Sequence, residues 1–206
     1  MKRGVCVIGA GGHAKVVIAV LEAVGYGIAC VLDDDSSKWG SSILGHRISG
    51  PTSILRKKKC PAVLAVGSNK MRKALDVSLR GVRWLTIVHP SSWVHGSVSL
   101  GPGTVVMAGA VIQPDTVIGR HGIINTAASV DHDCRIGDFC HVAPGARLGG
   151  GVILCDCVLM GIGAVAKHGT SVGAGTVIGA GAAVVSDIPA LSVAVGVPAR
   201  PRKCKV

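Results

Sequence analysis

Aromatic side chains are almost absent from this chain. Of its 206 residues only five carry aromatic rings, whereas thirty are glycine. A core built from such a sequence must be narrow and filled with aliphatic and small side chains. Long apolar runs are missing too, because no stretch reaches 18 apolar residues. We therefore expect neither a membrane-spanning helix nor a membrane partner, and the N-terminus enters a strand pattern without the features of a signal peptide.

Metal-binding cysteine patterns are also missing. The eight cysteines include no C-x-x-C pair, and Cys155-x-Cys157 is too closely spaced for an ordinary zinc site without further ligands. Cys134 and Cys140 fall on inward positions of the repeat described below, so we interpret them as core residues. We expect reduced thiols, a cytoplasmic location and no bound metal.

Acidic residues are few, and the formal net charge is +11. Most of the excess lies in residues 1–87, which hold fourteen Lys and Arg against five Asp and Glu. The basic clusters are the run 56–59 and the tail with Arg200, Arg202, Lys203 and Lys205. Neither is interleaved with aromatics, so we expect no nucleic-acid partner. The run is interpreted as a solvated face, whereas the tail could also face the phosphates of a bound cofactor.

An apolar residue recurs at every sixth position from Val94 to Val184. Helices repeat every ~3.6 residues and strands every ~2.0, so neither explains this period. A parallel β-helix does, because each hexad forms one short side of a coil and the stacked coils share a core. The leading residues are Val94, Leu100, Val106, Ile112, Ile118, Ile124, Val130, Ile136, Val142, Leu148, Leu154, Met160, Ala166, Val172, Ile178 and Val184.

Residues 1–87 alternate strand and helix patterns instead. Strands are predicted at 5–8, 28–32, 62–66 and 83–88, and helices at 14–24 and from about Lys70, with Ser68 or Asn69 as N-cap. This alternation predicts a small parallel sheet with its ligand at the carboxyl ends of the strands. We therefore divide the chain into a Rossmann-like domain over 1–87 and a β-helix domain with a C-terminal tail over 88–206.

The first predicted strand runs into Gly9-Ala10-Gly11-Gly12-His13-Ala14, which matches G-x-G-x-x-A, and Asp33 follows about 20 residues later. Glycines allow close approach of a pyrophosphate, and a helix N-terminus offers free N–H groups. NAD and a nucleotide-diphosphate sugar both carry this group. Because 87 residues supply only one half of a dinucleotide fold, the loop favours a nucleotide sugar over NAD, and a purely structural loop stays an alternative.

The hexad repeat resembles that of the hexapeptide acyltransferases. In seven hexads glycine follows the leading residue, as in their [LIV]-G-x-x-x-x pattern: Gly101, Gly119, Gly137, Gly149, Gly161, Gly173 and Gly179. The resemblance implies a left-handed coil with three hexads per turn. The expected fold class is therefore α/β plus β, a small Rossmann-like domain followed by a left-handed parallel β-helix of about five coils.

Two segments narrow the resemblance. The opening Gly9-Ala10-Gly11-Gly12-His13 and the segment Asn125–Val142 resemble the sialic acid O-acetyltransferase-like family. That family includes N-acetyltransferases acting on UDP-, dTDP- or GDP-linked 4-amino-4,6-dideoxy sugars. Membership would imply an acetyl-CoA-dependent enzyme without a metal, assembled as a homotrimer, with a nucleotide sugar as the other substrate.

The resemblance also assigns roles to residues. It makes His132 the catalytic base, with Asp133 raising its basicity and His141 contacting acetyl-CoA. The nucleotide sugar is expected at Gly11, Gly12, His13, Asp33, Asp34 and Gly67. Acetyl-CoA is further expected at Gly161, Ile162, Gly179, Pro198 and Arg200, the last two within the closing motif 196–200.

Chemistry supports His132 without the resemblance. Acyl transfer from a thioester needs a base of near-neutral pKa, which histidine supplies, and an adjacent carboxylate can orient the ring and stabilise the imidazolium. Of the other histidines, His13 lies in the phosphate loop, His168 is interpreted as a surface residue, and His46, His89, His95 and His121 as surface or loop residues. The oxyanion donor is not identified, although Gly149–Gly151 lie one coil from His132.

Two alternatives stay open. The same motifs fit an O-acetyltransferase of sialic acid or another sugar. Less favoured is a non-catalytic role, in which the β-helix is a trimeric scaffold for a nucleotide-binding module. The sequence does not identify the nucleotide base, the sugar or the group that is acylated. It also does not show whether the acyl group is strictly acetyl.

Overall fold

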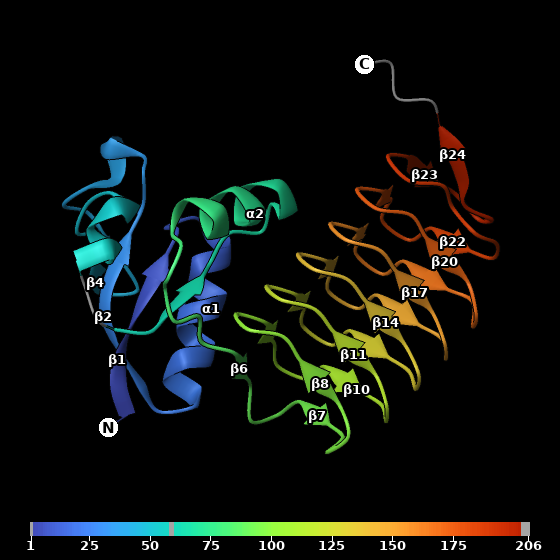
Figure 1. Ribbon diagram of the computed structural model, residues 1–206, viewed down its shortest axis with the longest axis horizontal. Coiled ribbons are helices and arrows are strands. Elements are labelled where there is room, and N and C mark those ends of the chain that lie inside the picture. The colour runs from blue at the N-terminus through green and yellow to red at the C-terminus, as the bar shows by residue number, and fades with distance from the viewer. Residues whose placement is uncertain (1, 58–59, 203–206) are drawn as a thin grey trace.

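The chain forms a small α/β unit that packs against a parallel β-solenoid (Figure 1). This computed structural model describes residues 2–57 and 60–202. Lys58 and Lys59 of the basic run, and Lys203, Cys204 and Lys205 of the tail, lie outside the described residues. Neither helix in the described part is long and apolar enough to cross a membrane.

The N-terminal unit is built on a three-stranded parallel sheet in the order β2-β1-β5. Its strands are β1 (Lys2–Ile8), β2 (Tyr26–Leu32) and β5 (Ala62–Leu64), and its helices are α1 (Gly12–Ala23) and α2 (Asn69–Ser78). The segment between β2 and β5 holds 3₁₀ turns at Ser36–Lys38 and Thr52–Lys57. It also holds a hairpin of β3 (Ser42–Ile43) and β4 (His46–Arg47). Helix α2 begins as predicted, with the Ser68 hydroxyl accepting a hydrogen bond from the Met71 N–H.

One predicted strand is wrong. Residues 83–88 do not form a fourth full strand of the N-terminal sheet, because only an isolated bridge joins Trp84 to Ala62. The chain then leaves the sheet, and β6 (Ile87–Val88) pairs with β9 (Val105–Val106) of the solenoid. The segment therefore belongs partly to each unit.

The solenoid is a triangular prism with three parallel sheets as its faces. The first face holds β6, β9, β12 (Ile123–Ile124), β15 (His141–Val142), β18 (Leu159–Met160), β21 (Val177–Ile178), β23 (Val193–Val195) and the antiparallel β24 (Arg200–Arg202). The second holds β7 (Trp93–Val94), β10 (Val111–Ile112), β13 (Ser129–Val130), β16 (Arg147–Leu148), β19 (Val165–Ala166) and β22 (Ala183–Val184). The third holds β8 (Ser99–Leu100), β11 (Val117–Ile118), β14 (Arg135–Ile136), β17 (Ile153–Leu154) and β20 (Ser171–Val172).

The hexad prediction is confirmed. Paired strands lie 18 residues apart, as Val111 with Ser129, so three hexads complete one coil. Every leading residue from Val106 to Val184 is buried, as are Cys134 and Cys140, and each fully buried aliphatic side chain contributes roughly 1.5–3 kcal/mol. The sixteen hexads supply six sides of the second face and five sides of each of the other two, which is five coils and one further side, and additional sides at both ends bring the solenoid to about six coils. β6 at one end and a bridge from Ile188 to Val172 at the other supply the additional sides.

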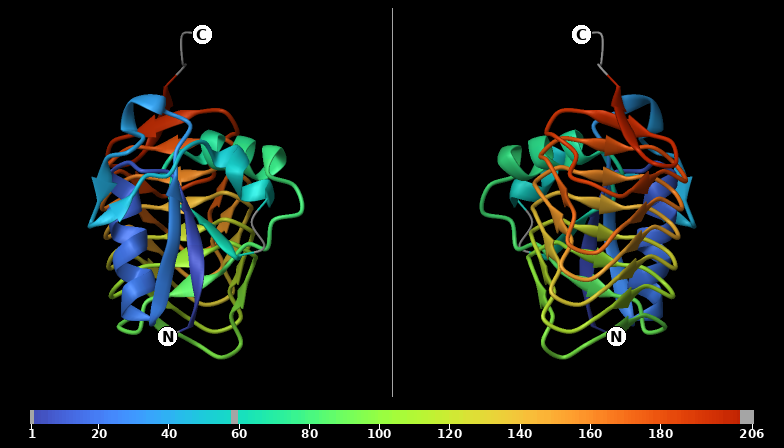
Figure 2. Two further views of the ribbon diagram at one scale, coloured as in Figure 1. Left: turned by 90° about the vertical axis from the view of Figure 1, so that its left-hand side faces the viewer. Right: turned by 90° about the vertical axis from the view of Figure 1, so that its right-hand side faces the viewer.

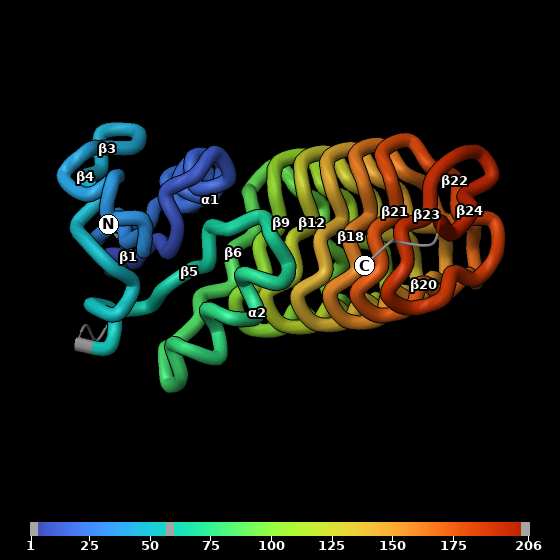
Figure 3. Tube along the Cα trace, turned by 90° about the horizontal axis from the view of Figure 1, so that it is seen from above, coloured from blue at the N-terminus to red at the C-terminus, as the bar shows by residue number. Residues whose placement is uncertain are grey.

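The N-terminal unit covers one side of the prism (Figure 2). Seen from above, it lies on the side of the earlier coils (Figure 3), and α2 reaches the later ones, where Asn69 donates to the carbonyls of Cys157 and Val158. Helix α1 packs between the N-terminal sheet and the first coils, where Val17 and Ile18 share a buried cluster with Ile87 and Met107. The carboxyl ends of the N-terminal strands are thereby held next to the first face.

Candidate active site

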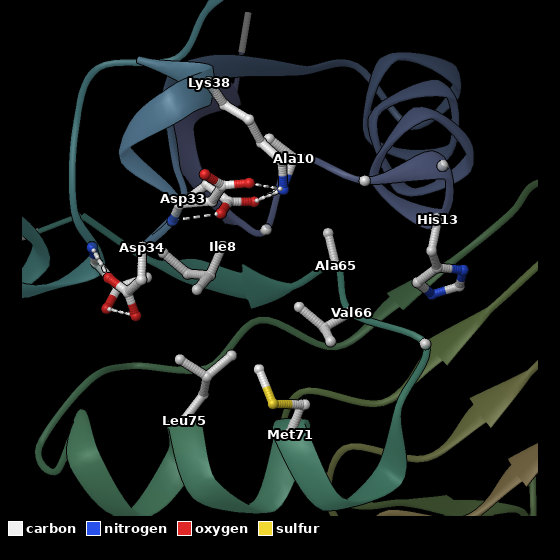
Figure 4. Close-up of a pocket in the computed structure, with 16 residues that line it drawn as sticks. Ile8, Ala10, His13, Asp33, Asp34, Lys38, Ala65, Val66, Met71 and Leu75 are labelled. Atoms are coloured by element: carbon white, nitrogen blue, oxygen red, sulfur yellow. Dashed lines mark hydrogen bonds and ion pairs between the residues drawn. The ribbon is translucent and has the colours of Figure 1, made fainter.

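A cavity of about 430 Å³ opens at the carboxyl ends of the three N-terminal strands (Figure 4). Its size falls within the range of small-molecule sites. Loops after β1, β2 and β5 line it together with α2, so a cavity lies at the edge of the sheet where the sequence predicts a ligand. All six residues predicted to contact the nucleotide sugar lie in its wall: Gly11, Gly12, His13, Asp33, Asp34 and Gly67.

The glycine loop keeps its backbone open to this cavity. A Cβ placed on Gly11 or Gly12 would meet nothing within 4 Å, and Gly11 is the N-cap of α1 without any side-chain cap. The free N–H groups at the start of α1 therefore offer a site for an anion. Gly9 is required for a different reason, because its φ is +106° and a Cβ there would come 2.7 Å from the Val66 side chain.

Asp33 mainly holds the loops around the cavity together by hydrogen bonds. Its carboxylate accepts hydrogen bonds from the Ala10 N–H at 2.7 Å, the Asp35 N–H at 2.9 Å and Lys38 Nζ at 3.1 Å (Figure 4). Partial burial raises the pKa of Asp33, but these hydrogen bonds outweigh it and hold the pKa below its ordinary value. The neighbouring Asp34 is exposed and accepts from the N–H and hydroxyl of Thr52.

Two neutral histidines meet where the cavity approaches the first face. The rings of His13, on α1, and His141, on β15, lie 6.1 Å apart. Burial, with a smaller contribution from the charge of Arg72, lowers the pKa of each to about 4. His141 bonds the Gly67 carbonyl through Nδ1 at 3.3 Å and the Asn125 amide through Nε2 at 3.0 Å. The Nε2 atom of His13 is buried and has no hydrogen-bond partner among the described residues.

His132 and Asp133 form a pair on the outside of the prism, at the corner between the second and third faces. His132 Nδ1 lies 2.7 Å from Asp133 Oδ2, and the two side chains are 60% and 64% exposed. Asp133 adopts a φ of +59°, in the left-handed region that Asp tolerates better than most residues. The hydrogen bond that His132 donates to the Asp133 carboxylate is the main reason why the pKa of His132 is raised. With Nδ1 donating to Asp133, Nε2 carries the lone pair that can accept a proton.

The free edge of the His132 ring lies over Gly150, one coil further along. A Cβ on Gly150 would come 2.7 Å from His132 Nε2. The neighbouring N–H groups are used within the solenoid, since Gly149 donates to the Ala166 carbonyl and Gly151 to the His132 carbonyl. The Gly150 N–H has no acceptor among the residues that the structure describes. An N–H group without an acceptor among these residues and an exposed imidazole therefore lie side by side.

The cavity and the His132–Asp133 pair lie on different sides of one chain. Arg72 of α2 donates a hydrogen bond to the Phe139 carbonyl, at the corner between the third and first faces. On the first face, His141 is hydrogen-bonded to the Gly67 carbonyl. His132 follows β13 and precedes β14, so its corner is the one opposite the first face. The structure does not bring the predicted base to the predicted nucleotide-sugar site within a single chain.

Apart from His141 on β15, the residues predicted for acetyl-CoA occupy the corner between the first and second faces and the final coil. Gly161 and Gly179 are stacked in successive coils, and a Cβ on Gly161 would come 2.6 Å from the Ile178 carbonyl oxygen. Ile162 is 63% exposed beside them. Pro198 follows a cis peptide bond, and Arg200 lies exposed on β24. Coil stacking therefore explains the glycine at position 161 without a ligand.

Comparison with known proteins gives a consistent result. The model of the PglD N-terminal domain matches residues 4–76. The GDP-perosamine N-acetyltransferase of Escherichia coli is 33% identical over 211 residues, covering 96% of this chain and 95% of that protein. This chain belongs to the nucleotide amino-sugar N-acetyltransferases.

Solved structures of relatives agree with this family. PerB from Caulobacter crescentus, in complex with CoA and GDP-perosamine, is 41% identical with a TM-score of 0.92, covering 97% of both chains. The acetyltransferase domain of PglB from Neisseria gonorrhoeae, in complex with acetyl coenzyme A, is 37% identical with a TM-score of 0.90, covering 98% of this chain and all of that one. The protein is thus an acetyl-CoA-dependent N-acetyltransferase of a nucleotide amino sugar with the β-helix fold of hexapeptide acyltransferases. A purely non-catalytic scaffold is not what the chain resembles.

Three features of the structure were not predicted from the sequence. His121, interpreted above as a surface or loop residue, is buried at 1% exposure between Trp84 and Phe139. Arg72 was not singled out, although it is equally buried. Gly150 was named only as one of three glycines. A charged residue on a polar helix gives no signal of burial, because the surface that covers it comes from another unit.

Proposed function

We propose that the protein transfers the acetyl group of acetyl-CoA to the amine of a GDP-linked 4-amino-4,6-dideoxy sugar, GDP-perosamine or a close relative. The observation that carries this is the exposed His132–Asp133 pair with its free Nε2 beside the open N–H of Gly150. GDP-perosamine is named for two relatives that match this chain over nearly its full length. The same sugar class with UDP or dTDP, and O-acetylation of a sugar, are the alternatives.

The nucleotide sugar is proposed to bind in the 430 Å³ cavity. Its pyrophosphate would lie at the N-terminus of α1, where Gly11 and Gly12 leave the backbone uncovered. Asp34, His13 and Gly67 would contact the rest of the ligand, while Asp33 holds the loops in place. The buried, unpartnered Nε2 of His13 is suited to a hydrogen bond with the substrate, since a buried polar atom left without a partner is costly.

His132 is proposed as the general base. Its Nε2 takes a proton from the attacking amine while the amine nitrogen forms a bond to the thioester carbon. The C–S bond then breaks, CoA leaves as a thiolate, and the protonated imidazole can return its proton to that sulfur. Asp133 holds the ring and stabilises the imidazolium. This direct transfer uses neither Cys134 nor Cys140, which are buried and donate to the carbonyls of Gly149 and Cys155.

The Gly150 N–H is proposed as the donor to the tetrahedral oxyanion. It is the member of Gly149–Gly151 whose hydrogen is not used in the solenoid. It also lies against the base, which places both groups at one reacting carbon. A single donor of this kind is worth roughly 2.7–4 kcal/mol of transition-state stabilisation.

We propose a cyclic homotrimer in which one chain supplies the cavity and a neighbour supplies His132. The support is geometric: within one chain the two lie on different sides of the prism. The second and third faces also expose Val165, Val117 and Ile153, which a neighbouring prism would cover. Acetyl-CoA is then proposed to lie between prisms, at His141, Gly161, Ile162, Gly179, Pro198 and Arg200. A cytoplasmic location and the division at residues 87 and 88 complete the proposal.

An acceptor screen tests this function. Release of CoA thiol would be followed with acetyl-CoA and GDP-, UDP- and dTDP-linked 4-amino-4,6-dideoxy sugars, with the matching 4-hydroxy sugars and free sialic acid as controls. We expect release with the GDP-linked amine and a product heavier by one acetyl group. Release with sialic acid or a hydroxy sugar but with no amine would replace N-transfer by O-transfer.

A further inference from the structure

Arg72 is a fully buried cation between the two units of the chain. It lies on α2 and is 1% exposed. Its guanidinium shares its N–H groups among six oxygen acceptors within 2.7 to 3.1 Å. A buried guanidinium is costly unless it is hydrogen-bonded throughout, and here every nitrogen is. So many directed bonds fix the positions of the acceptors as well as of the arginine.

These acceptors come from three separate parts of the molecule. Nη1 donates to the carbonyls of Val66 and Gly67, in the loop after β5. Nε donates to the His121 carbonyl on one coil, and Nη2 to the carbonyls of Phe139 and Cys140 on the next. One planar group therefore joins the loop of the nucleotide-sugar cavity to two successive coils of the solenoid.

The loop that Arg72 holds, Val66–Gly67, lies between two cavities. Gly67 lines the nucleotide-sugar cavity and also a second cavity of about 650 Å³ between α2 and the later coils. The Gly67 carbonyl accepts a hydrogen bond from Arg72 at 2.8 Å and also lies 3.3 Å from His141 Nδ1. The position of this one peptide thus sets where the nucleotide-sugar cavity ends, next to His13 and His141.

We propose that Arg72 is a positioning residue that fixes the Val66–Gly67 loop against the solenoid and so sets the affinity for the nucleotide sugar. The inference rests on the proposed function, because it needs the cavity to hold that substrate. Arg72 does not line the cavity, so it acts through the loop rather than by touching the ligand. His141 keeps its second hydrogen bond, to Asn125, when the loop moves, so acetyl-CoA binding should be affected far less.

The competing explanation is that Arg72 only holds the N-terminal unit to the solenoid. The chain offers a matched control for this explanation. Arg120 Nη2 bonds Asp76 on α2 at 2.9 Å, so this ion pair joins the same helix to the same corner of the solenoid. It makes no contact with Val66, Gly67 or His141 among the interactions of the described residues. Arg120→Met therefore removes a link between the units and leaves the loop held.

The experiment compares Arg72→Lys with Arg120→Met in the full-length assembled enzyme. Lysine keeps the charge but cannot span six acceptors, so we expect the KM for the nucleotide sugar to rise about tenfold, the loss of about 1.4 kcal/mol. The kcat at saturation and the KM for acetyl-CoA should change by less than about threefold, the pattern of lost ground-state binding. Arg120→Met should lower the melting temperature without changing either KM.

Two further measurements make the outcome decisive. Ethylguanidinium added to Arg72→Ala should restore the nucleotide-sugar KM by refilling the buried site. If the Arg72 variants do not fold, Asn69→Ala decides, because Asn69 Oδ1 accepts from Arg72 Nη2 at 2.9 Å, and we expect its KM to rise about threefold. An unchanged nucleotide-sugar KM in the folded variant, or an equal rise in Arg120→Met, overturns the inference. A wild-type enzyme without transferase activity would instead overturn the proposed function.

Discussion

The imidazole of His132 lies on the bare backbone of Gly150, one coil further along the solenoid. A Cβ at position 150 would approach the ring atoms Cε1 and Nε2 to 2.6 and 2.7 Å. The hydrogen bond to Asp133 holds the exposed ring in this position, and the ring fits there because position 150 carries no side chain. The predicted base and the Gly150 N–H are neighbours for this reason.

Gly150→Ala should therefore lower kcat with little effect on folding. The methyl group displaces the His132 ring and crowds the Gly150 N–H, and we expect a loss of about 10² in kcat, the lower end for one oxyanion donor. Steady-state kinetics and the melting temperature measure the two effects. Gly96→Ala is the matched control, since a Cβ there meets nothing within 4 Å and its φ is not positive. Equal kcat in the two variants would contradict this arrangement.

His132→Ala should lower kcat by about 10² to 10⁴, the usual contribution of a general base. The KM of either substrate should change little, because His132 is exposed on the corner opposite the N-terminal unit and supports no packing. Circular dichroism and light scattering would show that the variant is folded and assembled. A folded variant that keeps more than about half of the wild-type kcat would rule out His132 as the base.

The pH dependence should report the His132–Asp133 pair. Since the base must be unprotonated, log(kcat/KM) should rise with pH through the pKa of His132 and then level off. The hydrogen bond to the Asp133 carboxylate raises that pKa, so Asp133→Asn should move the rising limb to lower pH, and His132→Ala should abolish the limb. A limb that stays at the same pH in Asp133→Asn would show that another group titrates.

His13 and His141 should make the folded state sensitive to acid. Burial lowers the pKa of each to about 4, from 6.5 in the unfolded chain. The unfolded state then binds more protons between these values, so the stability contributed by the neutral rings is present above pH 6.5 and is lost as the pH falls toward 4. Melting temperatures between pH 7 and pH 4.5 should fall more steeply in wild type than in His13→Asn. Parallel curves would argue against buried neutral rings.

Mixed assemblies should show whether the site is shared between chains. Gly11→Val should weaken nucleotide-sugar binding by blocking close approach of the backbone, while leaving His132 and acetyl-CoA binding intact. His132→Ala keeps the cavity but lacks the base. Co-expressed at random in a cyclic trimer, the two inactive chains should recover about one quarter of wild-type activity, because each mixed trimer contains one intact junction. No recovery, or light scattering that gives the mass of one 20.8 kDa chain, would contradict the shared site.

The solenoid could be predicted from the sequence because its stabilising contacts repeat. Each inward side chain packs on residues of adjacent coils, as Ile112 does on the coil of Val130, so the hexad period alone determines the pattern of burial. Strands β1, β2 and β5, the cap at Ser68 and the glycine loop could be predicted for a similar reason, since local sequence determines them. The ends of the solenoid were less certain, because β6 pairs with the first coil only after the chain has left the other sheet.

Only the tertiary structure decided how the two units meet. Nothing in the pattern of α2 distinguishes Arg72, which is buried, from its neighbour Lys73, because the carbonyls of Phe139 and His121 that surround Arg72 are brought there by the packing of one unit on the other. The same holds for His121, buried by Trp84 from the N-terminal side. Residue types and spacing, together with the family resemblance, predicted His132 as the base and Gly11 as part of a phosphate loop. That the two lie on different sides of one chain follows from the winding of the coils, a long-range property that no local pattern contains.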